Sequence, residues 1–211
     1  MISVRARWLL GAAAVAAALA GFWLAAQLDR AGPQLASGTW LPRPKVVEDF
    51  TLTDTSGRAF TRRELAGTPT LVFFGFTHCP DVCPTTLLKL AQIEKRTAGA
   101  PPRVLFISVD PQRDTPQVLG IYVHAFDPAF QGLTGEPQVI ARLAANFAVA
   151  VNRVELPGGD YTMDHSAVVF LLDDAARIRA IFTPPFEVAA FAADLTRAAP
   201  YLGSAGARAA T

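Results

Sequence analysis

The chain is poor in the two residue types that most often bind soft metals. It has two cysteines, Cys79 and Cys83, and three histidines in 211 residues. Two thiolates exclude an iron–sulfur cluster, which is usually held by four. No run of lysine or arginine is long enough to indicate nucleic-acid binding, and the formal net charge is only +1. The length predicts one domain of about 150 residues with appendages.

Both cysteines lie in one short stretch, GFTHCPDVCPTTL, four positions apart and each followed by proline. The spacing alone leaves a disulfide switch and part of a metal site both open. A structural disulfide would close a gap of only three residues, so it would add little stability by restraining the unfolded chain. Zinc would require a fourth ligand, and the chain has no further cysteine to offer.

The N-terminal part contains the only long apolar run. From Trp8 to Leu28 no residue is charged, and a helix of this length would measure roughly 31 Å, close to the hydrocarbon thickness of a bilayer. Arg5 and Arg7 precede the run and Asp29 follows it. The positive-inside rule therefore places the N-terminus in the cytoplasm and the rest across the membrane. A cleavable signal peptide is the alternative, and it leads to the same compartment.

Composition divides the chain into four parts. We expect a membrane anchor at residues 1–28 and a Pro/Gly-rich tether at residues 29–45. A folded domain is expected at residues 46–202, followed by a disordered tail at residues 203–211.

Within the domain, hydrophobic periodicity predicts alternating strands and helices. Hairpins are expected at residues 49–60 and 166–182, other strands at 69–76, 103–110 and 148–154, and helices at 84–97, 115–126, 136–147 and 185–199. This order predicts an α/β fold with a central mixed sheet flanked by helices and an N-terminal hairpin extension. The cysteines directly follow the strand at 69–76, at its carboxyl end, where open α/β sheets form their sites.

Pro84 is well placed as the first residue of the following helix, and it disfavours helical geometry at Cys83. A sulfur at the N-terminal end of a helix is close to the positive end of the helix dipole. We therefore expect the thiolate form of Cys83 to be favoured.

A metal site needs a third ligand, and the histidines are the candidates. His78 is adjacent to Cys79, but neighbouring side chains tend to project apart, which favours a supporting role. His124 lies within a predicted helix and is interpreted as a surface residue. His165 sits where a Gly-Gly loop meets a core strand. Its position alone does not decide between a ligand and an ordinary histidine at a strand end.

Three motifs together resemble the Sco (SenC) family of copper chaperones for cytochrome c oxidase. They are GFTHCPDVCPTTL, SVDPQRDTP and DYTMDHSAVVFLLD, in that order, within a likeness that covers roughly residues 46–202. The resemblance implies a thioredoxin-like fold that binds one copper ion, Cu(I) or Cu(II), through Cys79, Cys83 and His165. It also implies that Asp164 supports the site and that Asp81 shapes the cysteine loop. Arg113, in the second motif, belongs to the same face without an assigned role.

The family resemblance also implies a function. Such proteins help to mature the binuclear copper centre of an oxidase subunit, by supplying copper or by reducing that subunit's cysteines. The expected partners are this copper-centre subunit, an upstream copper carrier or thiol reductant, and the membrane through residues 1–28. The expected location is the inner membrane, with the domain on the periplasmic side.

The alternative is an enzyme, a thiol–disulfide oxidoreductase acting on cysteine pairs of an exported partner. Thioredoxins as a class carry a cis-proline that faces their cysteines just before a core strand. Here the corresponding residues are Met163, Asp164 and His165. A potential ligand in place of that proline favours the chaperone over the reductase, although both functions require reduced cysteines.

Overall fold

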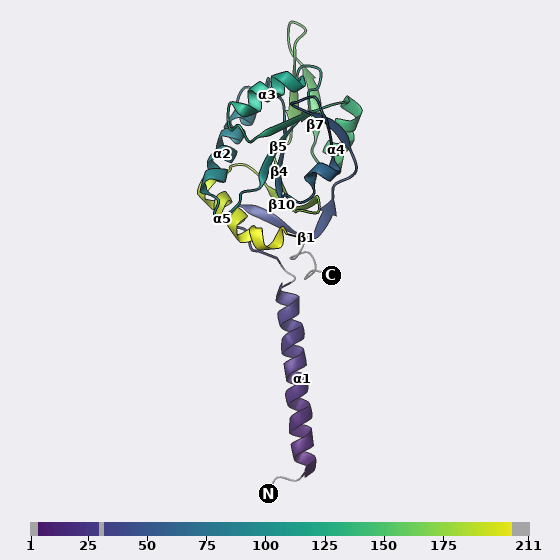
Figure 1. Cartoon of the computed structure of the whole chain (residues 1–211), viewed down its shortest axis with the longest axis vertical. Coiled ribbons are helices and arrows are strands. Elements are labelled where there is room, and N and C mark those ends of the chain that lie inside the picture. Colours follow the sequence, from purple (N-terminus) through teal and green to yellow (C-terminus); the bar gives the residue numbers. More distant parts are fainter. Residues whose placement is uncertain (1–3, 30–31, 204–211) are drawn as a thin grey trace.

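A computed structural model describes residues 4–29 and 32–203. Helix α1 (Val4–Asp29) precedes a domain built around an eight-stranded sheet with the order β1-β10-β9-β4-β5-β6-β2-β3 (Figure 1). The strands of this sheet are β1 (Gly38–Val46), β2 (Thr51–Asp54), β3 (Ala59–Thr61), β4 (Thr70–Gly75), β5 (Arg103–Ser108), β6 (Gln131–Thr134), β9 (Val169–Leu172) and β10 (Arg177–Phe182). Two further strands, β7 (Val151–Glu155) and β8 (Tyr161–His165), pair with each other in a separate antiparallel ribbon.

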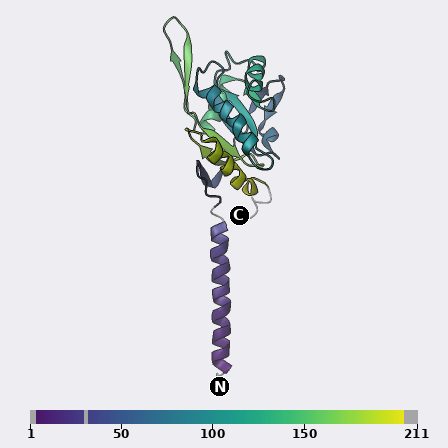
Figure 2. The same ribbon diagram turned by 90° about the vertical axis from the view of Figure 1, so that its left-hand side faces the viewer.

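Helices cover both faces of the large sheet, as Figures 1 and 2 show together. They are α2 (Val82–Arg96), α3 (Pro116–His124), α4 (Pro137–Asn146) and α5 (Val188–Ala198), with short 3-10 turns at Arg62–Leu65 and Ala199–Tyr201. Helices α2, α3 and α5 lie on one face and α4 lies on the other. The sheet is mixed, since β4, β5 and β6 are parallel while β9 runs antiparallel to β4. The predicted α/β architecture is therefore confirmed.

Strand β4 forms the middle of the core, and all six of its residues are buried. This confirms the expectation of a strand covered on both faces, which the continuous apolar sequence predicts. Phenylalanine fills much of the space around it. The fully buried rings are Phe73, Phe74, Phe76, Phe106, Phe130, Phe182 and Phe191. The cysteine loop thus begins from a strand whose residues are all buried.

Strand β1 occupies part of the segment that was expected to be a tether. It pairs antiparallel with β10 along one edge of the sheet. The pairing is interrupted between Trp40 and Lys45, and Pro42 and Pro44 lie within this interruption. Proline has no N–H to donate, so an edge strand with an irregularity is where a sheet tolerates it. The ordered sheet therefore begins before residue 46.

The first residues of the domain, before β1, are bound to a buried carboxylate of α5. Asp194 of α5 is fully buried and accepts the backbone N–H groups of Ala36 and Ser37 at 2.8 and 2.7 Å. The hydroxyl of Ser37 donates to the same carboxylate at 2.8 Å, and so does the guanidinium of Arg197. Residues 36–37 are thereby fixed against α5, at the end of the domain opposite the tip of the β7–β8 ribbon (Figure 1).

The β7–β8 ribbon projects from the body of the domain (Figure 2). Its turn contains Gly158 and Gly159, with φ angles of +91° and +86°. Glycine adopts this left-handed region at little cost, so the Gly-Gly pair allows the chain to reverse. The sequence predicted that a Gly-Gly loop leads directly to His165, whereas the structure places Tyr161–His165 in a strand.

Three of the expected parts include residues outside the described part of the chain. These are residues 1–3 of the predicted anchor, residues 30–31 of the predicted tether and residues 204–211 of the predicted tail. Among the residues whose side chains the structure describes, no helix offers a stretch that is long and apolar enough to cross a bilayer.

Candidate metal centre

Cys79 and Cys83 lie on either side of the start of α2, immediately after β4. Neither is in a disulfide, and Cys83 is fully buried whereas Cys79 is partly exposed. The backbone N–H of Cys83, in the first turn of α2, donates to the sulfur of Cys79 at 3.4 Å. Asp81 precedes the helix, but its side chain caps no backbone N–H. The Cys79 sulfur therefore provides the acceptor that a capping side chain usually supplies at a helix N-terminus.

The helix begins two residues earlier than the sequence predicted. Val82 is its first residue, Cys83 its second and Pro84 its third. The first four N–H groups of a helix have no partner within it, so Pro84 loses no hydrogen bond at this position. Cys83 is consequently helical, which corrects the expectation that Pro84 would keep it out of the helix.

The sulfur of Cys83 packs against the end of β4 at a glycine. A Cβ atom added to Gly75 would lie 2.9 Å from this sulfur and 2.6 Å from the ring of Phe106. Neither neighbour is a flexible chain end, so any larger residue at position 75 would displace one of them. Gly75 therefore creates the space in which the second sulfur sits.

His165 is the last residue of β8, and it meets the two cysteines at the base of the ribbon. Its Nε2 atom lies 3.5 Å from the sulfur of Cys83, and its Nδ1 atom lies 3.2 Å from the carbonyl oxygen of Ser166. The imidazole ring also contacts Phe73 and Phe76 in edge-on geometry, with ring centroids 6.1 and 5.9 Å away. A hydrogen on Nδ1 donated to that carbonyl leaves the lone pair of Nε2 directed at the sulfurs.

The structure brings together the three residues that the family resemblance implies as ligands. The two sulfurs and one imidazole nitrogen all lie within 4.8 Å of one another. Bonds from a metal to sulfur or nitrogen measure about 2.0–2.3 Å, so one ion fits between three such atoms with small adjustments. Two thiolates and an imidazole form a donor set that suits copper.

The two thiols differ in acidity, and the thiolate expected from the sequence at Cys83 is not the favoured form there. The hydrogen bond from Cys83, together with backbone N–H groups, lowers the pKa of Cys79 to about 5. The same contact with Cys79, reinforced by burial, raises the pKa of Cys83 well above its ordinary value. Cys79 is therefore the thiolate and Cys83 the thiol that donates to it. The helix N-terminus acts through the N–H of Cys83 on the sulfur of Cys79, not on the sulfur of Cys83.

We expect this difference to be measurable as selective alkylation of the reduced, metal-free protein. The rate at which iodoacetamide modifies Cys79 should follow a titration with a midpoint near pH 5, whereas buried Cys83 should remain unmodified. Replacing Cys83 by alanine removes the S–H donor, so the midpoint for Cys79 should rise. An unchanged midpoint in this variant would show that the acidity does not depend on Cys83.

The remaining residues proposed from sequence lie around the centre. The carboxylate of Asp164 is exposed, and because successive side chains of a strand point to opposite faces, it points away from His165. The observed partner of His165 Nδ1 is the Ser166 carbonyl. Asp81 accepts a hydrogen bond from the hydroxyl of Thr85 at 3.2 Å within the first turn of α2. His78 is exposed beside Thr77, at 3.1 Å from its hydroxyl, and His124 is an exposed residue at the end of α3.

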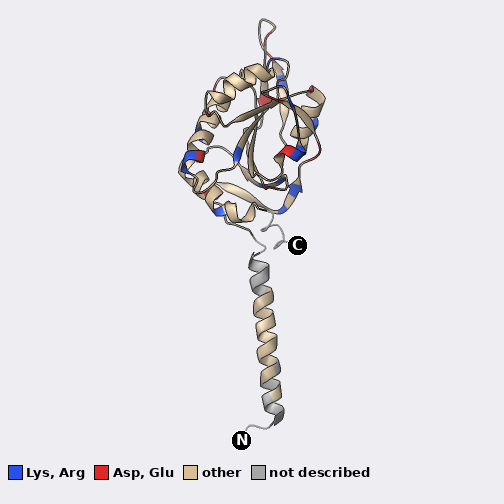
Figure 3. Ribbon diagram, viewed as in Figure 1, with Lys and Arg blue, Asp and Glu red and all other residues tan. Residues whose placement is uncertain are grey.

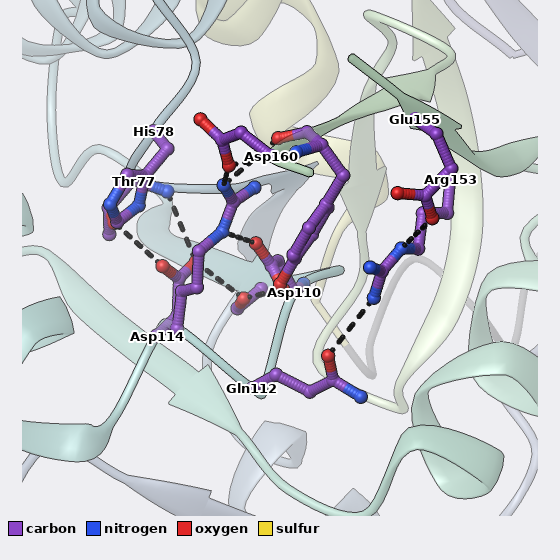
Figure 4. A network of polar contacts seen from close by, with 11 residues as sticks. Thr77, His78, Asp110, Gln112, Asp114, Arg153, Glu155 and Asp160 are labelled. Atoms are coloured by element: carbon purple, nitrogen blue, oxygen red, sulfur yellow. Dashed lines mark hydrogen bonds and ion pairs between the residues drawn. The ribbon is translucent and has the colours of Figure 1, made fainter. Parts of the chain in front are cut away.

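Sequence reasoning missed a network of polar residues beside the centre, shown in Figure 4. Asp114, which is fully buried, accepts the hydroxyl of Thr77 at 2.6 Å, and Arg113 donates to the carbonyl oxygen of Tyr161 at 3.0 Å. The motif SVDPQRDTP contained the signal, since it places three charged residues directly after a buried strand. Their partners lie far away in the sequence and were not predictable from it.

Comparison with known proteins shows a matching family and related sequences. The family described as SCO1/SenC matches residues 40–200. The mitochondrial SCO2 homolog of Bos taurus is 38% identical over 171 residues, which are 78% of this chain and 64% of the bovine protein. The chain thus aligns with slightly less than two thirds of that relative's length.

Solved structures give the same result. Copper-bound ScoI of Arabidopsis thaliana has a TM-score of 0.71 at 34% identity, over 74% of this chain and 98% of that chain. Copper-bound ScoI of Bradyrhizobium japonicum has a TM-score of 0.65 at 41% identity, over 72% and 98%. The predicted thioredoxin-like fold agrees with these structures.

Proposed function

The chain belongs to the SCO1/SenC family, and we propose that it is a copper chaperone for the assembly of cytochrome c oxidase. The observation that carries the proposal is the convergence of two sulfurs and one imidazole nitrogen within 4.8 Å, from a loop and a strand that are distant in the sequence. The two ScoI structures that resemble the chain were solved with copper bound, which supports copper as the ion.

In this proposal each ligand has a distinct task. Cys79 is ready to bind as a thiolate, whereas Cys83 must lose its proton when copper arrives. His165 binds through Nε2 while the Ser166 carbonyl holds its Nδ1–H. Three ligands leave a copper ion open to an incoming ligand from a partner. Cys79 is the more exposed of the two cysteines, so the partner approaches from its side of the centre.

Titration of the reduced full chain with Cu(I), without oxygen and in detergent micelles, tests the copper site. We expect one ion per chain, held in competition with a chromophoric Cu(I) chelator. The double variant Cys79→Ser, Cys83→Ser should lose this binding, because serine offers a hard oxygen in place of a soft sulfur. Equal binding by the double variant would place the copper elsewhere on the chain.

Thiol–disulfide exchange is a second candidate function, favoured by the unequal acidity of the two thiols. The Cys79 thiolate would attack a disulfide of the partner to form a mixed disulfide, and Cys83 would resolve it, so that the pair gives up two electrons and becomes a disulfide. In this role His165→Ala would keep turnover with a disulfide substrate while either cysteine variant would lose it. Turnover that depends on His165 would argue against simple exchange.

We further propose that α1 anchors the domain to the membrane. Residues 8–28 carry no charge, the described part of α1 is free of charged positions in Figure 3, and its large apolar side chains, such as Phe22 at 76%, are exposed. Exposed apolar surface of this extent favours contact with lipid. Membranes extracted with alkaline carbonate should retain the full chain, whereas release into the supernatant would contradict the anchor.

The partner and the compartment follow from these proposals. The recipient is the copper-centre subunit of cytochrome c oxidase, and an upstream copper carrier or thiol reductant loads the chaperone. With Arg5 and Arg7 on the cytoplasmic side, the domain lies on the periplasmic side of the inner membrane.

A further inference from the structure

Residues 109–115, between β5 and α3, supply no ligand, yet they contact both halves of the candidate metal centre. We name this segment the bracket loop. It starts where β5 ends, and the N–H of Val109 donates to the carbonyl of Gly75 at the end of β4, at 2.8 Å. Figure 4 shows its side chains directed to the cysteine loop on one side and to the β7–β8 ribbon on the other.

On the cysteine side, the contact is made by Asp114. Its buried carboxylate accepts the backbone N–H of Thr77 at 3.1 Å and the hydroxyl of Thr77 at 2.6 Å. The hydroxyl of Ser108, at the end of β5, donates to the same carboxylate at 2.6 Å. Hydrogen bonds to a buried carboxylate are among the strongest in proteins. Because Thr77 lies two residues before Cys79, these bonds fix the start of the cysteine loop.

On the histidine side, the contact is made by Arg113 and Asp110. Arg113 donates through Nε to Asp110 at 2.5 Å and through a second nitrogen to the carbonyl oxygen of Tyr161 at 3.0 Å. The hydroxyl of Tyr161 donates to the other carboxylate oxygen of Asp110 at 2.8 Å. The ring of Tyr161 lies between the guanidinium groups of Arg113 and Arg153, at 3.8 and 3.6 Å from its centroid. Tyr161 is therefore held by its backbone, its ring and its hydroxyl.

Tyr161 and His165 are four residues apart in β8, so their side chains point to the same face of the ribbon. The ribbon is not part of the eight-stranded sheet, and a two-stranded ribbon alone is only marginally stable. Its position relative to β4 must therefore come from contacts such as those of Tyr161. Arg113 also lies 6.0 Å from the ring of Phe76, which itself contacts His165.

We propose that Arg113 and Tyr161 are positioning residues, which set where the Nε2 atom of His165 lies relative to the two sulfurs. The bracket loop contacts the cysteine loop through Asp114, and it contacts Tyr161 of the ribbon through Arg113 and Asp110. The segments that carry the three ligands are therefore held against the same loop. This inference rests on the proposed copper site, and its test separates the two.

The main test is Arg113→Met, which preserves much of the side-chain volume and removes the forked donor. We expect the Cu(I) affinity to fall about 10- to 100-fold, as is typical when the support of a metal ligand is lost. X-ray absorption of the Cu(I)-loaded variant should show less nitrogen coordination and approach the spectrum of His165→Ala. Unchanged affinity and an unchanged spectrum would overturn the proposal.

Arg177→Met is the matched control for loss of stability. Arg177 pairs with Asp173 at 2.9 Å, and the exposures of their side chains, 25% and 1%, are close to the 19% and 3% of Arg113 and Asp110. Asp173 follows the end of β9 that pairs with the first residue of β4, which places it at the end of the sheet away from the cysteines. We expect Arg177→Met to lower the free energy of unfolding and to leave the copper spectrum unchanged. If both variants change copper binding in proportion to their lost stability, Arg113 has only a structural role.

Two milder variants separate geometry from charge. Arg113→Lys keeps the positive charge near Asp110 but lacks the planar fork that reaches Asp110 and Tyr161 together. It should therefore fail to restore wild-type affinity, whereas full rescue by lysine would reduce the role of Arg113 to charge neutralisation. Tyr161→Phe removes only the hydroxyl and should cause a smaller loss in the same direction. If Arg113→Met does not fold, Tyr161→Phe replaces it as the variant that tests the proposal.

A readout without copper distinguishes failure of this inference from failure of the proposed function. In the reduced, metal-free protein, amide hydrogen exchange in β8 should be faster in Arg113→Met than in the wild type and in Arg177→Met. Suppose that Arg113→Met speeds hydrogen exchange in β8, but His165→Ala binds copper as tightly as the wild type does. The proposed copper site is then wrong, whereas the role of the bracket loop in holding the ribbon is supported. Suppose instead that His165→Ala loses Cu(I) affinity, but Arg113→Met changes neither hydrogen exchange in β8 nor Cu(I) affinity. The positioning role of Arg113 is then wrong, whereas the proposed copper site is supported.

Discussion

Replacing His165 by alanine is expected to lower the Cu(I) affinity of the reduced protein by at least about 100-fold. Removing a residue that merely supports a ligand typically costs 10- to 100-fold, and His165 is proposed to be a ligand itself. The two remaining sulfurs would hold the ion without the nitrogen that lies 3.5 Å from Cys83. Competition with a chromophoric Cu(I) chelator under anaerobic conditions measures the change.

His78→Ala is the matched control for this experiment. His78 is adjacent to Cys79 in the sequence, but it is exposed and its ring contacts the hydroxyl of Thr77. The same chemical change at this position should leave the affinity close to that of the wild type. Unchanged copper binding in His165→Ala would refute the three-ligand site, and an equal loss in both variants would point to a general effect on the cysteine loop.

Replacing Asp194 by alanine is expected to destabilise the domain by about 3 kcal/mol. The change would leave the N–H groups of Ala36 and Ser37 without their buried acceptor and Arg197 without its partner. Urea unfolding of the full chain in a mild detergent measures the loss.

Asp49→Ala is the comparison for an exposed carboxylate. Asp49 pairs with Arg62 at 2.8 Å, but its side chain is 90% exposed. Surface pairs of this kind contribute between about 0 and 1 kcal/mol, so the variant should unfold almost as the wild type does. If Asp194→Ala were as mild as Asp49→Ala, the contacts with residues 36–37 would not hold the chain to the domain.

The contribution of Asp194 to the free energy of unfolding should also depend on pH. Burial by itself would raise the pKa of this carboxyl, but hydrogen bonds from Ala36, Ser37 and Arg197 outweigh burial and lower it below the ordinary value of 3.8. A carboxyl with a lowered pKa in the folded state stabilises the fold above its unfolded pKa and loses this contribution as the pH falls through its folded pKa. The difference in unfolding free energy between the wild type and Asp194→Asn should therefore be full at neutral pH and shrink below about pH 4.

The central part of the fold was predictable because its strands are unambiguous. The apolar run at β4 can only be a buried segment, and the turns around it limit its length. Strand β1 was missed because Pro42 and Pro44 are typical of a tether, and only the pairing with β10 reveals the irregular edge that accommodates them. Strand β8 was missed because its partner β7 and its contacts with the bracket loop are set by tertiary structure, not by apolar alternation.

The candidate site, too, was predictable in part from the sequence and depends in part on tertiary contacts. The spacing of the cysteines and the position of His165 drew attention to three residues that the structure places close together, and the family resemblance supplied the proposed ligand set. The expectation of a favoured thiolate at Cys83 was wrong, because the acidity of each thiol depends on which sulfur is buried and which receives the N–H of Cys83. Arg113 belonged to a recognised motif, but its role required knowledge of Tyr161, which lies 48 residues further along the chain.

The attachment of residues 36–37 to Asp194 limits how far the metal centre can travel. With α1 in the bilayer, as proposed, only the residues between Asp29 and Ala36 are available to separate helix and domain, a span of about 25 Å at full extension. The tip of the β7–β8 ribbon lies at the end of the domain away from α1 (Figure 1), and His165 lies at the base of this ribbon, so the height of the ligands above the lipid is set mainly by the domain itself. A recipient must therefore present its copper site at that height, and lengthening the segment before Ala36 would widen the range of recipients within reach.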